Sequence, residues 1–291
     1  MTIRINVNGE VGSEEDRLLS PLDQGFLFGA SVYETLRTYD GVPFLVARHL
    51  KRLRESASAL GIDIDVSDET LTRRLQETLE ASANAESSVR IVVSAGVGAI
   101  DYRQGSTKTP TIVIVVRPLQ SFPDSLYQEG ATASFVSIMR AGRGNLSPRI
   151  KSSNLLNNLM ALRQAHERGA YEALMLNPQG EVCEGSMSNV FVVTDATIAT
   201  PPISAGILEG ITRELVLSIA REGGFELEEK TVLPDELLGA DEVFITASSR
   251  QVVPIVKVDD QLIADGRPGP VTRKLISLYH DKVHALLRNE E

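Results

Sequence analysis

Cysteine is nearly absent from this sequence, which carries only Cys183 among 291 residues. A single cysteine excludes an internal disulfide and a cysteine-based metal site, and this favours a reducing compartment. Long hydrophobic runs are missing as well, because no stretch reaches the roughly 18 apolar residues that a membrane helix needs. The opening MTIRINVNGE lacks the basic and apolar segments of a signal peptide. We therefore expect a cytoplasmic protein with no membrane partner.

Basic residues are fewer than acidic ones. The 29 Lys and Arg against 39 Asp and Glu give a net charge of -10 and a pI near 5.1, which disfavours non-specific attraction to nucleic acid. We therefore expect no nucleic-acid partner, and any phosphate site must be local. With 42% hydrophobic residues, the chain has enough apolar material for one large or two medium domains.

Common catalytic patterns are missing too. The four histidines form no metal or triad pattern, so we expect no metal site. The stretch GASVYE lacks the Gly-x-Ser-x-Gly nucleophile elbow, so a hydrolase has little support.

The pattern of the first half predicts a sheet with helices. Asn8-Gly9 after an alternating run predicts a hairpin, and Gly25 to Tyr39 with the following Asp40-Gly41 and PFLV predicts another. Periodic runs predict helices over Ala47 to Leu60 and Glu69 to Ala83. The segment Pro118 to Asp124 has two prolines and no periodicity, so we place a domain boundary there.

The second half alternates strands with helices around Lys151. We expect a strand over Ala131 to Met139 and a glycine-containing loop (AGRGN) before this lysine, and helices over Leu155 to Arg168 and within Gly206 to Gly223 after it. Lys151 follows a short strand-like run and precedes small polar residues, which suits either a functional amine or a solvated surface charge.

Two further features are compatible with a bound anion, and a third is itself an anionic side chain. The loop Gly206 to Thr212 leads into a helix, where free N–H groups favour phosphate, although it lacks the lysine of a nucleotide-hydrolysing loop. Arg48, Lys51, Arg52 and Arg54 crowd one helix start, which suits a nearby anion or a solvated face. Glu184 lies on an apolar strand, either facing water or buried with a cationic partner.

Six segments together resemble one family of enzymes. They are FGASVYETLR (28–37), HLKRL (49–53), IKSSNLL (150–156), EGSMSN (184–189), GILEGITRE (206–214) and SSRQVVPI (248–255). In this order and spacing they resemble the class IV pyridoxal-phosphate enzymes, which include branched-chain and D-amino acid aminotransferases and 4-amino-4-deoxychorismate lyases. The resemblance covers nearly the whole chain.

The resemblance implies a role for each cofactor-binding residue. Lys151 would form a Schiff base with the aldehyde of pyridoxal 5'-phosphate and then move the substrate proton. Glu184 would bond the pyridine nitrogen and keep it protonated. The phosphate and the ring would be held by Arg52, Leu208, Ile211, Thr212 and Ser248.

The resemblance also implies a substrate side, where the chain departs from the family pattern. Phe28, Tyr33, Arg37, Tyr102 in the loop Gly98 to Arg103, and Ser249 would line it. Branched-chain enzymes usually have a tyrosine shortly after the lysine, whereas this chain has Leu155-Leu156, with Asn154 as a candidate substitute. Arg250 would bind a substrate carboxylate or point to solvent.

The family fold is α/β (α+β) with two domains, described as fold-type IV. It implies a small N-terminal α/β domain over residues 1–117, a linker over 118–124, and a larger cofactor-binding domain over 125–291 that is β-barrel-like with helices. Family members are usually homodimers with shared active sites, so we expect a homodimer.

We interpret the chain as an aminotransferase that exchanges an amino group between an amino acid and a 2-oxo acid. Apolar residues near the expected pocket, Phe28, Leu156 and Met187, favour a hydrophobic or branched-chain substrate. Within the family the alternatives are aminodeoxychorismate lyase and transamination of D-amino acids or R-amines. Outside it, the alternative is a non-catalytic domain that binds a phosphorylated metabolite.

Overall fold

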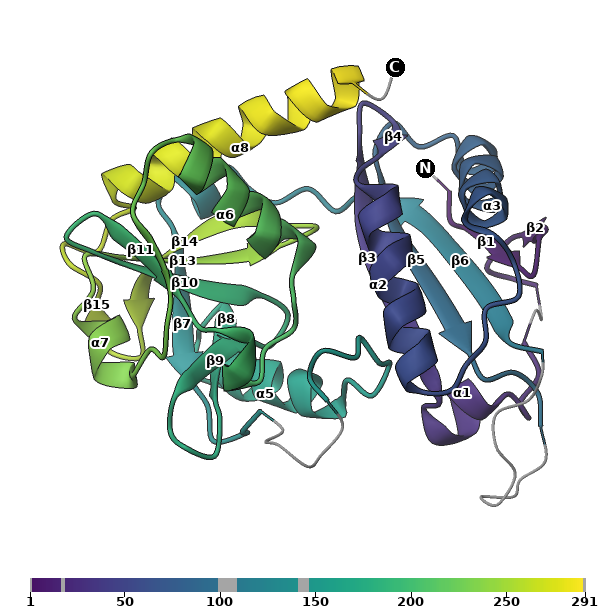
Figure 1. Ribbon diagram of the computed structural model, residues 1–291, viewed down its shortest axis with the longest axis horizontal. Helices are drawn as coiled ribbons and strands as arrows, with labels where there is room; N and C mark the ends of the chain where they lie inside the picture. Colours follow the sequence, from purple (N-terminus) through teal and green to yellow (C-terminus); the bar gives the residue numbers. More distant parts are fainter. Residues whose placement is uncertain (1, 17–18, 99–108, 141–146, 290–291) are drawn as a thin grey trace. The chain divides into compact units, whose positions relative to one another are not determined.

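The computed structural model describes residues 2–16, 19–98, 109–140 and 147–289 (Figure 1). The chain forms two compact units, and each is described by itself. The N-terminal unit comprises Met1–Ser121 together with Ile150–Asn154, and the C-terminal unit comprises Phe122–Arg149 with Leu155–Glu291. This grouping differs from the expected domain ranges in one respect, because the five residues around Lys151 belong with the N-terminal unit.

The N-terminal unit is a six-stranded antiparallel sheet with strand order β2-β1-β6-β5-β3-β4. Helices α2 and α3 cover one face of this sheet, with α2 packed on β3 and α3 on β1 and β6 (Figure 1). Its elements are β1 (Arg4–Val7), β2 (Glu10–Gly12), α1 (Gln24–Phe28), β3 (Ser31–Tyr39), β4 (Val42–Pro43), α2 (Val46–Ala59), α3 (Asp68–Ser82), β5 (Ser87–Ser94) and β6 (Thr111–Pro118).

One expected hairpin is confirmed and the other is partly wrong. Asn8 and Gly9 both have positive φ and join β1 to β2, as the sequence predicts. The run from Gly25, however, begins as helix α1, because the Asp23 side chain accepts a hydrogen bond from Gly25 N and caps the helix. Gly29 ends α1 in the left-handed conformation at φ 67°, so the strand starts only at Ser31.

The C-terminal unit is built on a sheet of nine strands, six of which close into a barrel. The order is β12-β11-β10-β13-β14-β7-β8-β9, and β9 also pairs with β10 through Glu184 and Asn189. Strand β7 is parallel to both neighbours, β12 is parallel to β11, and the other pairings are antiparallel. The barrel-like C-terminal fold expected from the resemblance is therefore confirmed.

Helices pack against the strands of this barrel. Helices α6 and α8 pack on each other and on β13, and α5 packs on β7 and β8 (Figure 1). The elements are α4 (Ser125–Gln128), β7 (Ala131–Phe135), α5 (Leu156–Glu167), β8 (Glu172–Leu176), β9 (Val182–Gly185), β10 (Asn189–Thr194), β11 (Thr197–Thr200), η1 (Ile203–Ala205), α6 (Ile211–Glu222), β12 (Leu227–Glu229), α7 (Pro234–Leu238), β13 (Glu242–Ala247), β14 (Gln251–Val258), β15 (Gln261–Leu262) and α8 (Pro270–Asn289). Among the helices described here, none has both the length and the apolar character needed to cross a bilayer.

Helix α2 buries polar as well as apolar side chains against β3. His49, Arg52 and Ser56 lie three or four residues apart, so they share one face of the helix, and all three are buried. Glu34 on β3 is 0% exposed and meets this face. Its carboxylate lies 2.7 Å from His49 Nδ1, and it accepts two hydrogen bonds of 2.7 Å from the Arg52 guanidinium.

The contacts within this cluster shift the pKa values of Glu34 and His49. Burial acts to raise the pKa of Glu34, but the charge and hydrogen bonds of Arg52, aided by His49, outweigh it and lower that pKa to about 2. Burial lowers the pKa of His49 below its usual 6.5, against the opposing effect of Glu34. The folded state therefore holds Glu34 ionised, with Arg52 fixed beside it.

We expect acid to destabilise the protein through this cluster. Because the folded pKa of Glu34 is about 2 and its ordinary value is 4.5, its contribution is complete above pH 4.5 and disappears as the pH falls toward 2. The lowered pKa of His49 acts in the same direction as the pH falls below 6.5, because the unfolded state then binds more protons. A Glu34→Gln variant should lose roughly 3 kcal/mol of unfolding free energy at pH 7, with the difference from the parent shrinking toward pH 2.

Denaturant unfolding at a series of pH values measures this difference. The matched control is Glu55→Gln on the same helix, where the carboxylate is 62% exposed and the expected change is below about 0.5 kcal/mol. The assignment would be contradicted if the difference in unfolding free energy between the parent and Glu34→Gln stayed constant from pH 7 to pH 2.

Candidate functional site

Lys151 is held in the N-terminal unit by its backbone. Tyr33 N donates to Lys151 O at 2.9 Å, and Ser153 N donates to Ser31 O at 2.9 Å, so the segment runs beside β3. Lys151 N donates to the Ser56 hydroxyl of α2 at 3.1 Å. The lysine backbone is therefore fixed between a strand and a helix, which restricts the reach of its amine.

The amine of Lys151 lies beside the buried phenol of Tyr33. Nζ is 3.4 Å from the Tyr33 hydroxyl and 4.4 Å from the centroid of its ring. The Arg90 guanidinium also stacks on this ring, with Cζ 3.9 Å from the centroid, and burial lowers the pKa of Arg90. Sequence reasoning proposed Tyr33 and missed Arg90, although an arginine inside the apolar run VRIVV was a signal of a paired or stacked cation.

Of the four basic residues at the start of α2, the structure places only Arg52 on the buried face. The side chain of Lys51 is 79% exposed and Arg48 is exposed. Arg54 binds the carbonyls of Ile64 and Val66 in the loop after α2 and the carboxylate of Asp68 at the start of α3. Of the two alternatives that the sequence left open, a solvated face describes Arg48 and Lys51, whereas Arg52 and Arg54 each lie beside an anion of the protein itself, Glu34 and Asp68.

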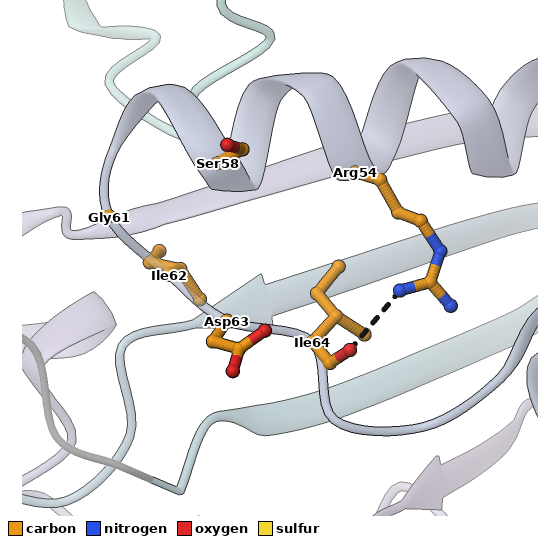
Figure 2. Close-up of a pocket in the computed structure, with 6 residues that line it drawn as sticks. All are labelled: Arg54, Ser58, Gly61, Ile62, Asp63 and Ile64. Carbon is orange, nitrogen blue, oxygen red and sulfur yellow. Dashed lines mark hydrogen bonds between the residues drawn. The ribbon is translucent and has the colours of Figure 1, made fainter.

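A hollow of about 350 Å³ lies beside this Arg54 side chain. Figure 2 shows the residues that line it and the hydrogen bond from Arg54 to the Ile64 carbonyl. The hollow is lined by Arg54, Ser58, Gly61, Ile62, Asp63 and Ile64, and none of these is a residue of the expected site.

Glu184 is a buried anion with a cationic partner, which decides between the two alternatives that the sequence left open. Its side chain is 6% exposed, and Oε1 lies 2.6 Å from the Arg140 guanidinium. Oε2 accepts hydrogen bonds from Leu208 N at 2.9 Å and from the Asn189 amide at 3.2 Å. Sequence reasoning missed Arg140, which directly precedes the glycine-containing loop noted in the sequence.

The loop 206–210 leads from Leu208 to the start of α6. Gly210 caps this helix without a side-chain hydrogen bond, because a glycine has none to offer and the Asn189 side chain fills the space of a Cβ. Ile211 and Thr212 are both buried in the first turn. Helix N–H groups that lack a side-chain cap, next to a buried hydroxyl, are donors that suit a phosphate.

Ser248 and Ser249 lie in the turn between β13 and β14, and both are half-buried. Arg250 in the same turn neither points to solvent nor stands free. Its side chain is 12% exposed, and Nη2 lies 2.7 Å from Oε2 of Glu172, a completely buried carboxylate on β8. Sequence reasoning did not single out Glu172.

The remaining predicted residues have varied positions. Phe28 ends α1 and is half-buried, and Arg37 stacks on the Tyr39 ring with Cζ 4.1 Å from its centroid. Asn154 donates its amide to Gly29 O at 3.0 Å. Tyr102 lies outside the described residues.

Apolar residues that the sequence assigned to the pocket are partly exposed. Leu156 is 69% exposed on α5, and Met187 is 38% exposed in the turn between β9 and β10.

Each unit carries its own set of the predicted site residues. The N-terminal unit holds Lys151, Tyr33 and Arg52, and it offers an amine and cations. The C-terminal unit holds Glu184, Leu208 and Thr212, and it offers a buried carboxylate and a helix start. Taken separately, the amine of the N-terminal unit suits a carbonyl group, while the carboxylate and helix start of the C-terminal unit suit a basic ring nitrogen and a phosphate.

Comparison with known proteins gives consistent relatives over nearly the full length of the chain. A protein of Methanocaldococcus jannaschii, provisionally named a branched-chain-amino-acid aminotransferase, is 36% identical over 96% of both chains. The D-alanine aminotransferase of Bacillus licheniformis is 36% identical over 97% of both chains. The aminodeoxychorismate lyase of Bacillus subtilis (strain 168) is 32% identical over 98% of this chain and 97% of its own.

A solved structure has the same fold. The branched-chain amino acid aminotransferase of Thermobaculum terrenum, solved in its PLP form, superposes with a TM-score of 0.88 at 28% identity, over 97% of this chain and 94% of that chain. The profile of the amino-transferase class IV family matches residues 31–258. The chain belongs to the class IV aminotransferase family.

Proposed function

We propose that this protein transfers an amino group between a hydrophobic amino acid, of the branched-chain type, and a 2-oxo acid. The observation that carries the proposal is the Lys151 amine, whose backbone is fixed by β3 and α2 and whose nitrogen lies 3.4 Å from the Tyr33 hydroxyl. An amine held at one place beside a phenol is arranged to take and return a proton. The branched-chain assignment rests on the names of a relative and of solved neighbours.

As a class IV aminotransferase, the protein is an enzyme that uses pyridoxal 5'-phosphate. This cofactor, when bound, supplies an aldehyde that bonds an amine and a ring that accepts electrons. In the proposed arrangement Lys151 is the residue that would hold the aldehyde group, and its amine would take and return the proton of the substrate α-carbon. Tyr33 orients the lysine nitrogen through its hydroxyl.

The proposed roles at the ring and phosphate follow from charge. The carboxylate of Glu184 would hold the pyridine nitrogen and keep it protonated; its Oε2 is fixed by Leu208 N and Asn189, and its Oε1 is paired with Arg140. The first turn of α6, with Ile211 and Thr212, would hold the phosphate. Arg52 adds a positive charge whose direction is set by the bidentate contact with Glu34.

A second candidate function has a specific observation in its favour. Leu155-Leu156 occupies the region where branched-chain enzymes usually have a tyrosine, and the amide of Asn154 is bound to Gly29 O. D-Amino acid transamination and aminodeoxychorismate lysis are therefore the alternatives, and curated relatives carry both names. A homodimer with shared active sites and a cytoplasmic location also stay predictions from the sequence.

Substitution of Lys151 tests the central role. Lys151→Arg keeps a cation but removes an amine that can bond an aldehyde, so we expect kcat to fall by about 10²- to 10⁴-fold or more. Borohydride reduction of the parent holoenzyme should abolish its visible absorbance band and place the label on Lys151, found by peptide mass spectrometry. Lys51→Arg, at a lysine that is 79% exposed on α2, is the control and should retain both band and activity. A colourless parent, or a label on another residue, would refute the proposal.

Half-reactions test the substrate class. The visible band of the purified holoenzyme should decay with L-leucine and recover with a 2-oxo acid, and D-alanine and R-phenylethylamine should leave it unchanged. Stopped-flow absorbance measures each rate, and pyruvate release from aminodeoxychorismate measures the lyase reaction. Decay with D-alanine but not L-leucine would replace the branched-chain assignment with D-amino acid transamination, and pyruvate release alone would replace it with the lyase.

A further inference from the structure

The carboxylate of Glu172 joins three segments of the C-terminal unit. Oε1 accepts hydrogen bonds from Ala173 N at 3.0 Å, from Ser186 N at 3.1 Å and from the Ser186 hydroxyl. Oε2 accepts from the Ser188 hydroxyl at 3.0 Å and from the Arg250 guanidinium at 2.7 Å. The side chain is 0% exposed, so β8, the turn 186–188 and the turn 248–250 meet at one buried group.

Arg250 is fixed by more than this ion pair. Its guanidinium carbon lies 5.4 Å from the centroid of the Tyr171 ring, and its carbonyl accepts a hydrogen bond from the Tyr127 hydroxyl at 3.3 Å. Burial acts to lower the pKa of Arg250, but Glu172 and Tyr171 outweigh it and raise that pKa. If the Arg250 guanidinium turned toward a substrate, the negative charge of buried Glu172 would lose its cationic partner. Burying a charge without such a partner is costly.

The turn 186–188 lies between Gly185 and Asn189, and both of these residues are held close to a buried carboxylate. Gly185 has no room for a Cβ, because the Ser188 hydroxyl and the Glu172 carboxyl group occupy that space. On the other side, the Asn189 amide donates to Glu184 Oε2 and to Leu208 O. The position of the Glu184 carboxylate therefore depends on a turn that Glu172 holds in place.

We propose that the Glu172–Arg250 pair is a positioning device that keeps the turn bearing Ser248 in register with the turn beside Glu184. The inference rests on the proposed function, in which Glu184 contacts the ring nitrogen, and on the expectation from the resemblance that Ser248 helps to hold the cofactor phosphate. One buried pair thus fixes the spacing of Ser248 and Glu184, the two residues that would hold opposite ends of the cofactor. Arg250 acts through its turn and does not bind the substrate carboxylate.

A comparison of two ligands isolates this role. Pyridoxal 5'-phosphate and pyridoxal differ only in the phosphate, so a displaced Ser248 turn should weaken the first ligand more than the second. In Arg250→Met we expect the dissociation constant of pyridoxal 5'-phosphate, measured by absorbance titration of the resolved enzyme, to rise about 10- to 100-fold. The constant for pyridoxal should change less than about 3-fold, and KM for the amino acid should stay near that of the parent.

Three further variants separate positioning from plain destabilisation. Arg250→Lys keeps the charge without the fork and should recover part of the affinity for pyridoxal 5'-phosphate. The double variant Glu172→Gln/Arg250→Met removes both charges, so its thermal midpoint should return toward the parent while the ligand preference stays lost. Glu242→Gln alters another buried carboxylate, which accepts from Val271 N and Thr272 N at the start of α8, and should lower the midpoint without changing the ratio of the two constants.

The outcomes are distinguishable. Equal weakening of both ligands, or no weakening, in a folded Arg250→Met variant would overturn the positioning role while the parent still binds the cofactor. A raised KM for the amino acid with unchanged cofactor affinity would also overturn it, and would assign Arg250 to the substrate. A parent that binds neither ligand would overturn the proposed function, and this inference with it.

Discussion

A carboxylate is costly to bury unless hydrogen-bond donors surround it, and this constraint organises both units of the protein. Glu34 in the N-terminal unit and Glu172 and Glu184 in the C-terminal unit are all buried. Each gathers donors from separate segments, so each ties together parts of the chain that are distant in sequence. Of these three carboxylates, Glu184 is proposed to act on the cofactor directly, and Arg52, which binds Glu34, is proposed to add positive charge near its phosphate.

The closure of the barrel involves one of these buried carboxylates. Strands β9 and β10 meet at Glu184 and Asn189, and the same two side chains share a hydrogen bond. The backbone contact that completes the barrel therefore also orients the carboxylate that is proposed to act on the ring of the cofactor. Rigid strands rather than a free loop hold the group, as a site that depends on fixed geometry requires.

The sequence predicts the repeated features of this fold well. Helix periodicity locates α2, α3 and α6, and the Asn8-Gly9 turn locates the first hairpin, because these signals are local. Sequence reasoning fails where a single side chain overrides the pattern. Asp23 turns the expected strand at Gly25 into a helix, and no periodic signal reveals such a cap.

Partners are harder to predict than elements. Sequence reasoning singles out Glu184 and Arg250, but it cannot say that Arg140 and Glu172 face them, because each pair is separated by tens of residues. The same limit applies to Arg52, whose buried partner Glu34 lies on the preceding long strand. Charge patterns along the chain indicate that a partner must exist, and only the tertiary fold identifies it.

The N-terminal unit is not one continuous piece of chain, since Ile150–Asn154 completes it from beyond the first 121 residues. A fragment ending at Ser121 would leave Tyr33 N and Ser31 O at an open strand edge and Ser56 without its backbone donor. Such a fragment lacks the segment that pairs with the edge of β3. A peptide with the sequence IKSSN has the hydrogen-bonding groups to fill that place. Cleavage of the polypeptide after Ser121 would thus place the N-terminal sheet on one fragment and Lys151, on which the proposed chemistry depends, on the other.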